Sequence, residues 1–322
     1  MSASGAELGQ RLAAGDLRAA PAALNLIEDR SPAAREETAA VLQAVSPAAL
    51  GHEAPAHLVG ITGPPGAGKS LLLGALVSAW RGAGRTVAVL AVDPSSKRSG
   101  GSLLGDRARI DHDPHDEGVL IRSTAAGGRL GGLAAPTREA AWALAAAYDL
   151  VVIETVGVGQ SETDVEEVCD SVALVVQPAS GDTLQFLKAG IMEVPNVLVV
   201  TKADLGDAAR RAQRDLESAL SSLGETIPVV AVSSIAPPSG ISDLVAALEG
   251  HRSQLDLTAT RTAARRATAL RELVTEHGEA ALRALGGRRS AERLLAGRDH
   301  GEDVAALVAA LSEHAGLERV DA

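Results

Sequence analysis

The sequence contains very little cysteine and very few aromatic residues. Its 322 residues include one cysteine, Cys169, and only two Trp, one Tyr and one Phe, so aromatic side chains make up 1% of the chain. A single cysteine excludes an internal disulfide and a thiolate cluster. So few aromatic rings provide no platform for stacking single-stranded bases. The core must therefore be built from the Ala, Val, Leu and Ile residues that supply most of the 46% hydrophobic content.

Positive charge and long apolar runs are also scarce. Asp and Glu outnumber Lys and Arg by 41 to 30, and the resulting net charge of −11 argues against a nucleic-acid partner, whose phosphates need clustered positive charge. No apolar run reaches the roughly 18–20 residues of a membrane helix. The first 24 residues lack a basic start followed by an apolar block, so they do not resemble a secretory signal. We therefore expect a cytoplasmic protein without a membrane or nucleic-acid partner.

Lysine is rare even among the basic residues. Only four of the 30 are Lys, and the other 26 are Arg. A chain that uses Arg almost everywhere is expected to keep Lys where a compact ammonium group cannot be replaced by a planar guanidinium. The four positions are Lys69, Lys97, Lys188 and Lys202. They direct the search for functional motifs.

The middle of the chain alternates between apolar runs and helical patterns. Seven continuous apolar runs are typical of parallel strands buried on both faces. They cover residues 57–62, 86–92, 119–121, 150–153, 171–177, 197–200 and 228–232. Helical patterns at 69–82, 136–147, 183–191 and 206–222 lie between several of them. This order predicts an α/β fold with a doubly wound, mostly parallel sheet.

Both ends of the chain have a helical pattern. Residues 1–50 contain Ala-rich segments at 6–14, 20–28 and 33–45, and Ser31 followed by Pro32 is typical of a helix start. The tail is Ala- and Leu-rich and charged, with helices expected at 258–285, 288–296 and 301–316. We therefore predict an N-terminal helical arm (1–50), a central P-loop domain (51–257) and a C-terminal helical region (258–322).

Residues 63–70 match the phosphate-loop pattern G-x-x-x-x-G-K-[ST], between an apolar strand and an apolar helix. Glycines let the backbone N–H groups converge on phosphate oxygens, and the helix N-terminus adds its positive dipole. Lys69 is expected to contact the β- and γ-phosphates and Ser70 to bind Mg²⁺. The predicted nucleotide contacts are Gly63, Pro64, Pro65, Gly66, Ala67, Gly68, Lys69 and Ser70.

Acidic residues follow two of the other predicted strands. Asp93 lies at the carboxyl end of a strand, where it can reach Mg²⁺ or its waters, although an Asp before Pro-Ser also commonly caps a turn. Glu154 begins the segment Glu-Thr-Val-Gly, in which the carboxylate faces the Mg²⁺ shell and the Gly157 N–H can bond the γ-phosphate. The glycine-bearing loop after Lys97 suits a segment that orders around a γ-phosphate.

Residues 201–204 read Thr-Lys-Ala-Asp and resemble the [N/T]KxD base-recognition motif of GTPases. The Asp204 carboxylate can accept two hydrogen bonds from guanine, from N1–H and the exocyclic amine, and adenine offers no such pair. The Lys202 stem is expected to pack along the base. Thr201 stands where Asn is usual and removes an amide that normally braces the loop. A backbone N–H in the segment Ser233, Ser234 and Ile235 is placed to meet guanine O6.

Taken together, these elements resemble the methylmalonyl-CoA mutase-associated GTPase family, the MeaB/ArgK group of the SIMIBI class of P-loop GTPases. The resemblance covers about residues 60–260. It is most specific in Gly-Gly-Ser-Leu-Leu-Gly-Asp at 100–106 and Glu-Thr-Val-Gly-Val-Gly-Gln-Ser-Glu at 154–162. The segments at 63–70, 92–96, 129–134, 184–193 and 201–204 also carry it.

The resemblance implies a homodimeric GTPase chaperone of an adenosylcobalamin-dependent acyl-CoA mutase. GTP binding and hydrolysis would gate cofactor loading and protect the mutase, with GTP or GDP and Mg²⁺ bound here and adenosylcobalamin bound by the mutase. It implies that Asp93, Asp106 and Glu154 are the Mg²⁺-linked acids and that the C-terminal helices form the dimer. It also implies switch or partner roles for Gln160, Gln185 and Lys188.

Two other functions remain open from the sequence. The segment 111–117 is dense in Asp and His, which would suit a metallochaperone GTPase, although such loops are more often solvated connectors. A kinase for a small molecule such as arginine or ornithine is the second alternative. No water-orienting Gln or arginine finger is assignable, so we expect Mg²⁺-dependent hydrolysis that is slow without a partner.

Overall fold

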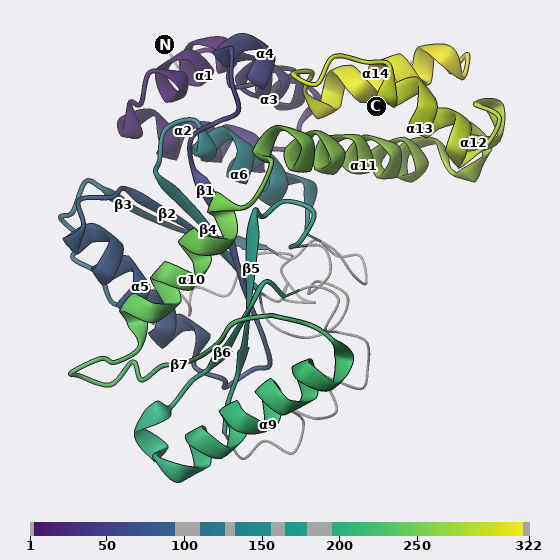
Figure 1. Cartoon of the computed structure of the whole chain (residues 1–322). Helices are drawn as coiled ribbons and strands as arrows, with labels where there is room; N and C mark the ends of the chain where they lie inside the picture. Colours follow the sequence, from purple (N-terminus) through teal and green to yellow (C-terminus); the bar gives the residue numbers. More distant parts are fainter. Residues whose placement is uncertain (1–2, 94–109, 126–132, 156–164, 179–194, 318–322) are drawn as a thin grey trace, which may run out of the picture. The chain divides into compact units, whose positions relative to one another are not determined.

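The computed structural model describes residues 3–93, 110–125, 133–155, 165–178 and 195–317 (Figure 1). The chain forms two compact units. One contains the α/β sheet and comprises Ala56–Ala141 and Tyr148–Leu255. The other is helical and comprises Met1–Pro55, Trp142–Ala147 and Asp256–Ala322. The helical unit thus combines both ends of the chain.

Among its described residues, the α/β unit is built on one sheet of seven strands. All the pairings are parallel, and the order is β3-β2-β4-β1-β5-β6-β7. The strands are β1 (His57–Thr62), β2 (Val87–Asp93), β3 (Val119–Ala125), β4 (Leu150–Glu154), β5 (Ser171–Val176), β6 (Val197–Val200) and β7 (Val229–Ala231). The predicted fold class is confirmed. β3 is longer than the predicted run because its last four residues, 122–125, are not a continuous apolar sequence.

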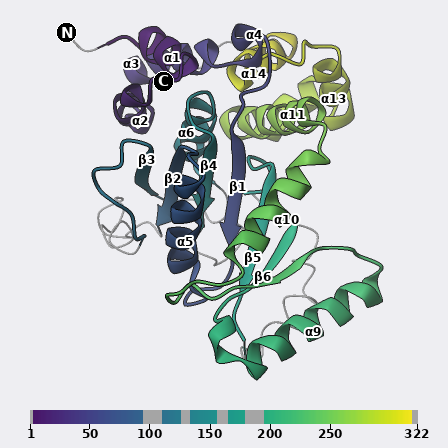
Figure 2. The same cartoon turned by 60° about the vertical axis from the view of Figure 1, so that its left-hand side comes forward.

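Helices cover both faces of the sheet, as Figure 1 and Figure 2 show. On one face α5 (Lys69–Gly82) and α10 (Ile241–Ser253) pack against residues such as Val59, Ile61 and Val175. On the other face α9 (Asp207–Leu223) packs against Leu174, Val176 and their neighbours. Because successive strand residues face opposite sides, both layers require apolar residues, which explains the continuous runs. Burying each large aliphatic side chain contributes about 1.5–3 kcal/mol.

The helical unit contains nine elements and part of a tenth among its described residues. They are α1 (Gly5–Ala13), η1 (Leu17–Ala19), α2 (Ala20–Glu28), α3 (Pro32–Ala44), α4 (Pro47–Leu50), α11 (Leu257–His277), α12 (Glu279–Ala284), α13 (Arg288–Ala296), α14 (Val304–His314) and the end of α6 (Ala135–Ala145). As the sequence predicts, the Ser31 hydroxyl caps α3, with Pro32 in its first turn. No helix in the described ranges is long and apolar enough to cross a membrane.

Two helix predictions need correction. The pattern at 258–285 predicts one helix, but the structure has α11 and α12, because Gly278 adopts a φ of 70° between them. This left-handed conformation favours glycine. Helix α10 was not predicted, although Gly240 precedes it and Leu244 and Leu248, four residues apart, place one apolar stripe on the sheet.

The C-terminal helices share an apolar core of their own. Leu273 of α11, Leu295 of α13 and Leu307 and Leu311 of α14 are almost completely buried against one another. Each helix therefore places its apolar stripe inside this unit. Dimer formation through these helices stays a prediction.

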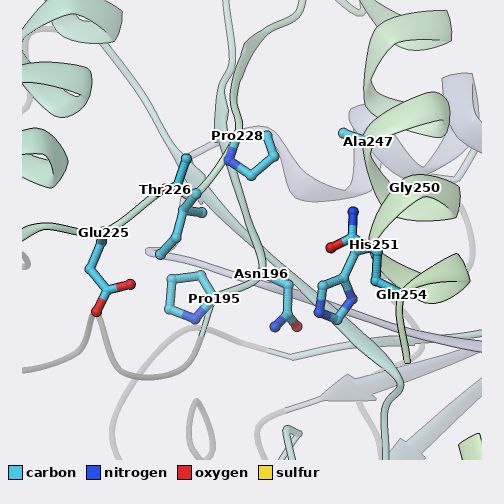
Figure 3. A pocket seen from close by; sticks show the side chains of 10 residues that line it. Pro195, Asn196, Glu225, Thr226, Pro228, Ala247, Gly250, His251 and Gln254 are labelled. Atoms are coloured by element: carbon cyan, nitrogen blue, oxygen red, sulfur yellow. The ribbon is translucent and has the colours of Figure 1, made fainter. Parts of the chain in front are cut away.

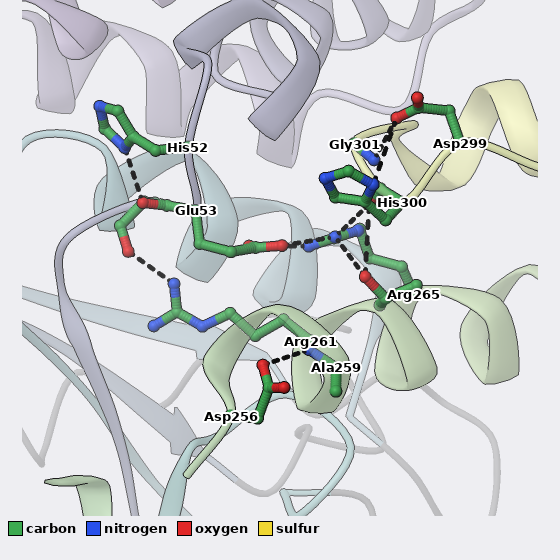
Figure 4. Close-up of polar contacts among 11 residues, drawn as sticks. His52, Glu53, Asp256, Ala259, Arg261, Arg265, Asp299, His300 and Gly301 are labelled. Carbon is green, nitrogen blue, oxygen red and sulfur yellow. Dashed lines mark hydrogen bonds and ion pairs between the residues drawn. The ribbon is translucent and has the colours of Figure 1, made fainter.

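A buried ion pair ties the segment before β1 to the C-terminal helices (Figure 4). Arg265 on α11 donates to both carboxylate oxygens of Glu53, at 3.0 and 2.7 Å. Their side chains are only 10% and 9% exposed. Arg265 also donates to the His300 carbonyl at 2.6 Å, and Arg261 donates to the Ala54 carbonyl at 2.6 Å. The Arg265 guanidinium thus joins α11 to two segments of the helical unit that are distant in sequence, those of Glu53 and His300.

The amino-terminal edge of the sheet is closed by polar side chains. His57 Nε2 and His251 Nδ1 each lie 2.8 Å from the hydroxyl of Ser171, which is completely buried. The Asp170 carboxylate accepts from the Leu58 N–H at 2.9 Å. Burial lowers the pKa of His251 below its ordinary 6.5, and the nearby Asp170 charge only partly opposes this effect. His251 is therefore favoured in its neutral form.

We expect Glu53→Ala to destabilise the helical unit by about 3–5 kcal/mol, because it leaves a buried guanidinium without its carboxylate. Hydrogen exchange of α11 and α14 amides would measure the loss. The exposed pair Arg288–Glu292, with side chains 70% and 50% exposed, provides the control, and Glu292→Ala should cost less than about 1 kcal/mol. Equal effects of the two substitutions would contradict the role given to Glu53.

Stability of the α/β unit should fall as the pH drops below about 6.5. There the unfolded chain protonates His251 while the folded chain, with its lowered pKa, resists protonation, so unfolding takes up a proton. Above about pH 7.5 the residue is neutral in both states and contributes no slope. This pH dependence can be measured by urea unfolding between pH 8 and 5. In a Trp142→Phe background the fluorescence of buried Trp80 reports the unfolding of the α/β unit. His251→Gln should reduce the slope, and an unchanged slope would refute the assignment.

Candidate nucleotide-binding site

The phosphate loop lies where the strand order reverses. β1, which precedes it, lies between β4 and β5 in the centre of the sheet. Ligands of open α/β sheets bind at the carboxyl ends of the strands at such a switch point. Gly63 has a φ of 136°, and a Cβ there would collide with the Val175 carbonyl oxygen of β5. Glycine is therefore required where the loop passes over the neighbouring strand.

The Lys69 ammonium is held inside the curve of this loop. It donates to the Gly63 carbonyl at 2.6 Å and the Pro64 carbonyl at 3.1 Å, and its side chain is only 7% exposed. Lys69 is the first residue of α5, so the helix N-terminus and the ammonium lie together. This concentrates positive potential at the loop, as phosphate recognition requires.

The structure brings Ser70 and Glu154 together. The Ser70 hydroxyl donates to Glu154 Oε1 at 2.9 Å, and Glu154, the last residue of β4, pairs in register with Ile61 of β1. Glu154 is buried. A hydroxyl and a carboxylate are hard oxygen donors, and Mg²⁺ typically takes one or two protein ligands besides phosphate and water. These two residues therefore fit the predicted magnesium site.

The remaining acidic and switch residues are placed only in part. Asp93 is the last residue of β2, which pairs with β4, so its backbone lies at the same edge of the sheet as Glu154. Asp106 and Gly157 lie outside the described residues, as do Lys97, Gln160, Gln185 and Lys188. Their predicted roles stay predictions.

The base-recognition segment adopts a tight turn after β6. Lys202 has a φ of 55°, an uncommon left-handed conformation for a residue with a side chain. Its ammonium donates to Gln177 Oε1 at 2.6 Å and to the phosphate-loop carbonyl of Gly66 at 3.4 Å. The Lys202 stem thus spans from the base segment to the phosphate loop.

Asp204 and Ser233 come together from different loops. Asp204 lies in the short helix η4 (Ala203–Leu205), and its Oδ1 accepts from the Ser233 hydroxyl at 2.9 Å. The same hydroxyl accepts weakly from the Ile235 N–H at 3.4 Å. Ser234 follows directly, and the Ile235 side chain is 63% exposed. The predicted base contacts therefore form one cluster.

Thr201 braces the phosphate loop, contrary to the expectation that losing the usual Asn would remove this contact. Its hydroxyl oxygen lies 2.6 Å from the Ala67 carbonyl and 3.1 Å from the Val176 carbonyl, and its side chain is 3% exposed. The hydroxyl has a single proton, which it donates to the nearer carbonyl, that of Ala67. The short β-branched side chain reaches the loop because β6 lies next to β5.

Sequence reasoning missed two polar contacts at this edge. Gln177, directly after β5, accepts from Lys202. The Thr155 hydroxyl donates to the Thr62 hydroxyl at 2.9 Å, where β4 and β1 end. A polar residue at the carboxyl end of a buried apolar strand was the available signal in each case.

The segment 111–117 does not form a metal site in the structure. Arg81 donates to both carboxylate oxygens of Asp116, each at 2.7 Å, and this contact lowers the pKa of Asp116. His112 Nδ1 lies 2.9 Å from the Ile110 carbonyl. Within the described residues, no group of three or more His, Cys, Asp and Glu is placed to hold a metal ion.

Comparison with known proteins gives a consistent result. The family model "Methylmalonyl Co-A mutase-associated GTPase MeaB" matches residues 20–286. The chain is 45% identical over 199 residues to a Pyrococcus abyssi protein named as a GTPase, an alignment that covers 62% of this chain and 59% of that protein. It is 40% identical over 265 residues to a Caulobacter vibrioides protein with the same type of name, covering 80% of each.

Two further similarities extend this result. The chain is 38% identical over 256 residues to the mitochondrial methylmalonic aciduria type A homolog of Caenorhabditis elegans, covering 75% of this chain and 64% of the homolog. The crystal structure of a LAO/AO transport system kinase superposes with a TM-score of 0.65 at 29% identity, covering 96% of both chains. The chain thus aligns with about three fifths of the length of the Pyrococcus relative and with nearly all of this solved structure.

We expect Thr201→Val to weaken GDP binding about fivefold or more, since it keeps the shape but leaves the buried Ala67 carbonyl without its donor, a loss of about 1–3 kcal/mol. Thr201→Ser retains the hydroxyl and should bind GDP within about threefold of wild type. Isothermal titration would measure both affinities. Equal GDP affinities for the Val and Ser variants would show that the hydroxyl does not brace the loop.

Proposed function

This chain belongs to the methylmalonyl-CoA mutase-associated GTPase family, MeaB, and from that membership we propose that it binds and hydrolyses GTP as a chaperone of an adenosylcobalamin-dependent acyl-CoA mutase. Nucleotide state would gate cofactor loading and protect the mutase from inactivation. The cobalamin would be bound by the mutase, whereas GTP and Mg²⁺ would be bound here.

The observation that best supports nucleotide binding is the contact between the base-recognition segment, 201–204, and the phosphate loop, 63–70. Thr201 contacts the Ala67 carbonyl and Lys202 contacts that of Gly66, so the base segment holds two consecutive residues of the phosphate loop. A nucleotide has its base and phosphates in one molecule, and pre-positioned loops bind both without an ordering cost. This arrangement supports a nucleoside triphosphate more than a simple phosphate ligand.

Guanine selectivity is proposed to come from Asp204. An ionised carboxylate has about four acceptor positions, so accepting from Ser233 leaves it able to accept from guanine N1–H and the exocyclic amine. Ser233 orients the carboxylate by donating to one oxygen. Adenine has an acceptor at N1 and no amine at C2, so it would place an acceptor against the carboxylate and would not offer this pair of donors.

Hydrolysis would depend on positioning and charge. Lys69 would exchange its contacts with the Gly63 and Pro64 carbonyls for phosphate oxygens and stabilise negative charge there. Ser70 and Glu154 would hold Mg²⁺, which when bound supplies further positive charge to the phosphates. No described residue of the site is assigned to orient the attacking water. We therefore propose that turnover is slow until the mutase binds.

A kinase is the second candidate, favoured by the similarity to a transport system kinase. It differs from the GTPase proposal in the fate of the γ-phosphate, which would be transferred to an acceptor such as arginine or ornithine instead of water. Incubation with γ-labelled GTP, with and without each amino acid, separates the two. Label in inorganic phosphate supports hydrolysis, and label on the amino acid supports the kinase.

The mutase proposal predicts that the affinity for the mutase depends on the bound nucleotide, and that a substitution at Asp204 changes which base is required. A non-hydrolysable GTP analogue should change the affinity of wild type for purified methylmalonyl-CoA mutase, measured by titration. In Asp204→Asn the response should require a xanthosine triphosphate analogue, because the Asn amide can donate to the oxygen that replaces the guanine amine.

Asp207→Asn provides the control, because Asp207 is exposed and paired with Arg210, and it should keep the guanine response. GTP hydrolysis without any mutase binding would refute the chaperone proposal while retaining the GTPase. Failure of Lys69→Ala to reduce hydrolysis would refute the assigned site.

A further inference from the structure

A second pocket lies at the amino-terminal edge of the sheet in the α/β unit (Figure 3). Its volume is about 600 Å³, within the range of small-molecule sites. It is bordered by the segments that lead into β6 and β7 and by the last turn of α10. The phosphate loop follows the carboxyl end of β1, so the two sites lie at opposite edges of the sheet, separated by a six-residue strand of about 20 Å.

One side of this pocket is polar. Figure 3 shows the Asn196 amide beside the His251 ring, with Gln254 directly after the helix that carries His251. Asn196 Oδ1 accepts from the Val172 N–H at 2.7 Å. This contact fixes which end of the amide is the oxygen, so Asn196 presents its NH₂ group, a donor, away from β5.

The His251 ring is held in one orientation from behind. Its Nδ1 contacts Ser171, which also contacts His57, so Nε2 is the ring nitrogen directed away from this buried chain. Ser171 has one proton, and the histidine that receives it determines whether His251 Nε2 is a donor or an acceptor. The hydrogen bonds among His57, Ser171 and His251 therefore orient the His251 imidazole without fixing whether its Nε2 donates or accepts. Ser171 is completely buried, which excludes it as a nucleophile.

The opposite side of the pocket is largely apolar. Figure 3 shows the ring of Pro195 to the left of the His251 ring and that of Pro228 above it, with the Glu225 carboxylate turned away from the imidazole. Ile227 is a further apolar residue of the lining, and Ala247 adds another from α10, one turn before His251. None of the described lining residues is Lys or Arg, and burial disfavours a charged His251. The lining offers neutral donors but no positive charge, so a phosphate or carboxylate would be less favoured than an uncharged ligand.

We propose that this pocket binds a small, uncharged, planar heterocycle that places a carbonyl or ring nitrogen against Asn196 Nδ2 and His251 Nε2. The apolar proline rings would contact the ligand, and Gln254 would supply an adaptable amide. The site is independent of the nucleotide site in composition and in position, so its occupancy does not require the proposed GTPase function.

The test uses three ligands of one shape and different charge. They are nicotinamide, which is neutral, nicotinate, which is an anion, and 3-picolylamine, which is a cation at pH 7.5. Binding to the full-length chain is followed by the imidazole carbon–proton NMR signals of its eight histidines, with His251 assigned from His251→Gln. We expect nicotinamide to shift the His251 signal saturably with a dissociation constant of about 1 mM or below, and GDP not to compete.

Matched variants separate binding from folding. His251→Gln and the exposed Gln254→Ala should each weaken nicotinamide binding, the former at least about tenfold. Because His251 is the histidine of the described lining, binding to His251→Gln is followed through the backbone amide signals of Asn196 and Gln254. Asp243→Asn, on the same helix but outside the lining, should leave it unchanged. The proposal is overturned if no ligand gives a saturable shift, if nicotinate or 3-picolylamine binds better than nicotinamide, or if Gln254→Ala has no effect.

Discussion

The position of β1 between β4 and β5 is the constraint on which the nucleotide site depends. Because β1 pairs in parallel with both neighbours, the register that aligns Ile61 with Glu154 also sets the carboxylate beside the Ser70 hydroxyl. On the other side, β5 passes so close that only glycine fits at position 63. The backbone hydrogen bonds of one central strand therefore set both the Ser70–Glu154 pair and the path of the phosphate loop.

A second layer of contacts turns these separate loops into one site. The base segment follows β6, two strands away from β1, yet Thr201 and Lys202 reach the phosphate-loop carbonyls of Ala67 and Gly66. A threonine hydroxyl lies one bond closer to its own backbone than an asparagine amide nitrogen, so the Ala67 carbonyl must lie correspondingly close to the Thr201 backbone. The strained left-handed conformation of Lys202 is part of this geometry, and such strain is tolerated where a site requires it.

The sequence predicted the sheet and the loop more completely than the contacts between loops. Apolar runs and the glycine-lysine pattern are local signals, so the strands and residues 63–70 could be identified without tertiary information. The pairing of Asp204 with Ser233 was expected only as proximity of two motifs. The contact of the Thr201 hydroxyl with the phosphate loop was not predicted, because a motif compares side-chain types and contains no distances between neighbouring strands. Gly278 shows the same limit, since glycine inside a helical pattern does not reveal its φ.

The two edges of the sheet differ in how their polar groups are satisfied. At the carboxyl edge, Lys69 and Lys202 donate to loop carbonyls, contacts that a phosphate or a base can replace. At the amino edge, His57, Ser171 and His251 satisfy one another inside the fold. Exchangeable contacts suit a ligand that comes and goes with hydrolysis, whereas a buried chain of hydrogen bonds costs too much to break. Any ligand at the amino edge must therefore add to this network instead of replacing it, which selects for uncharged molecules.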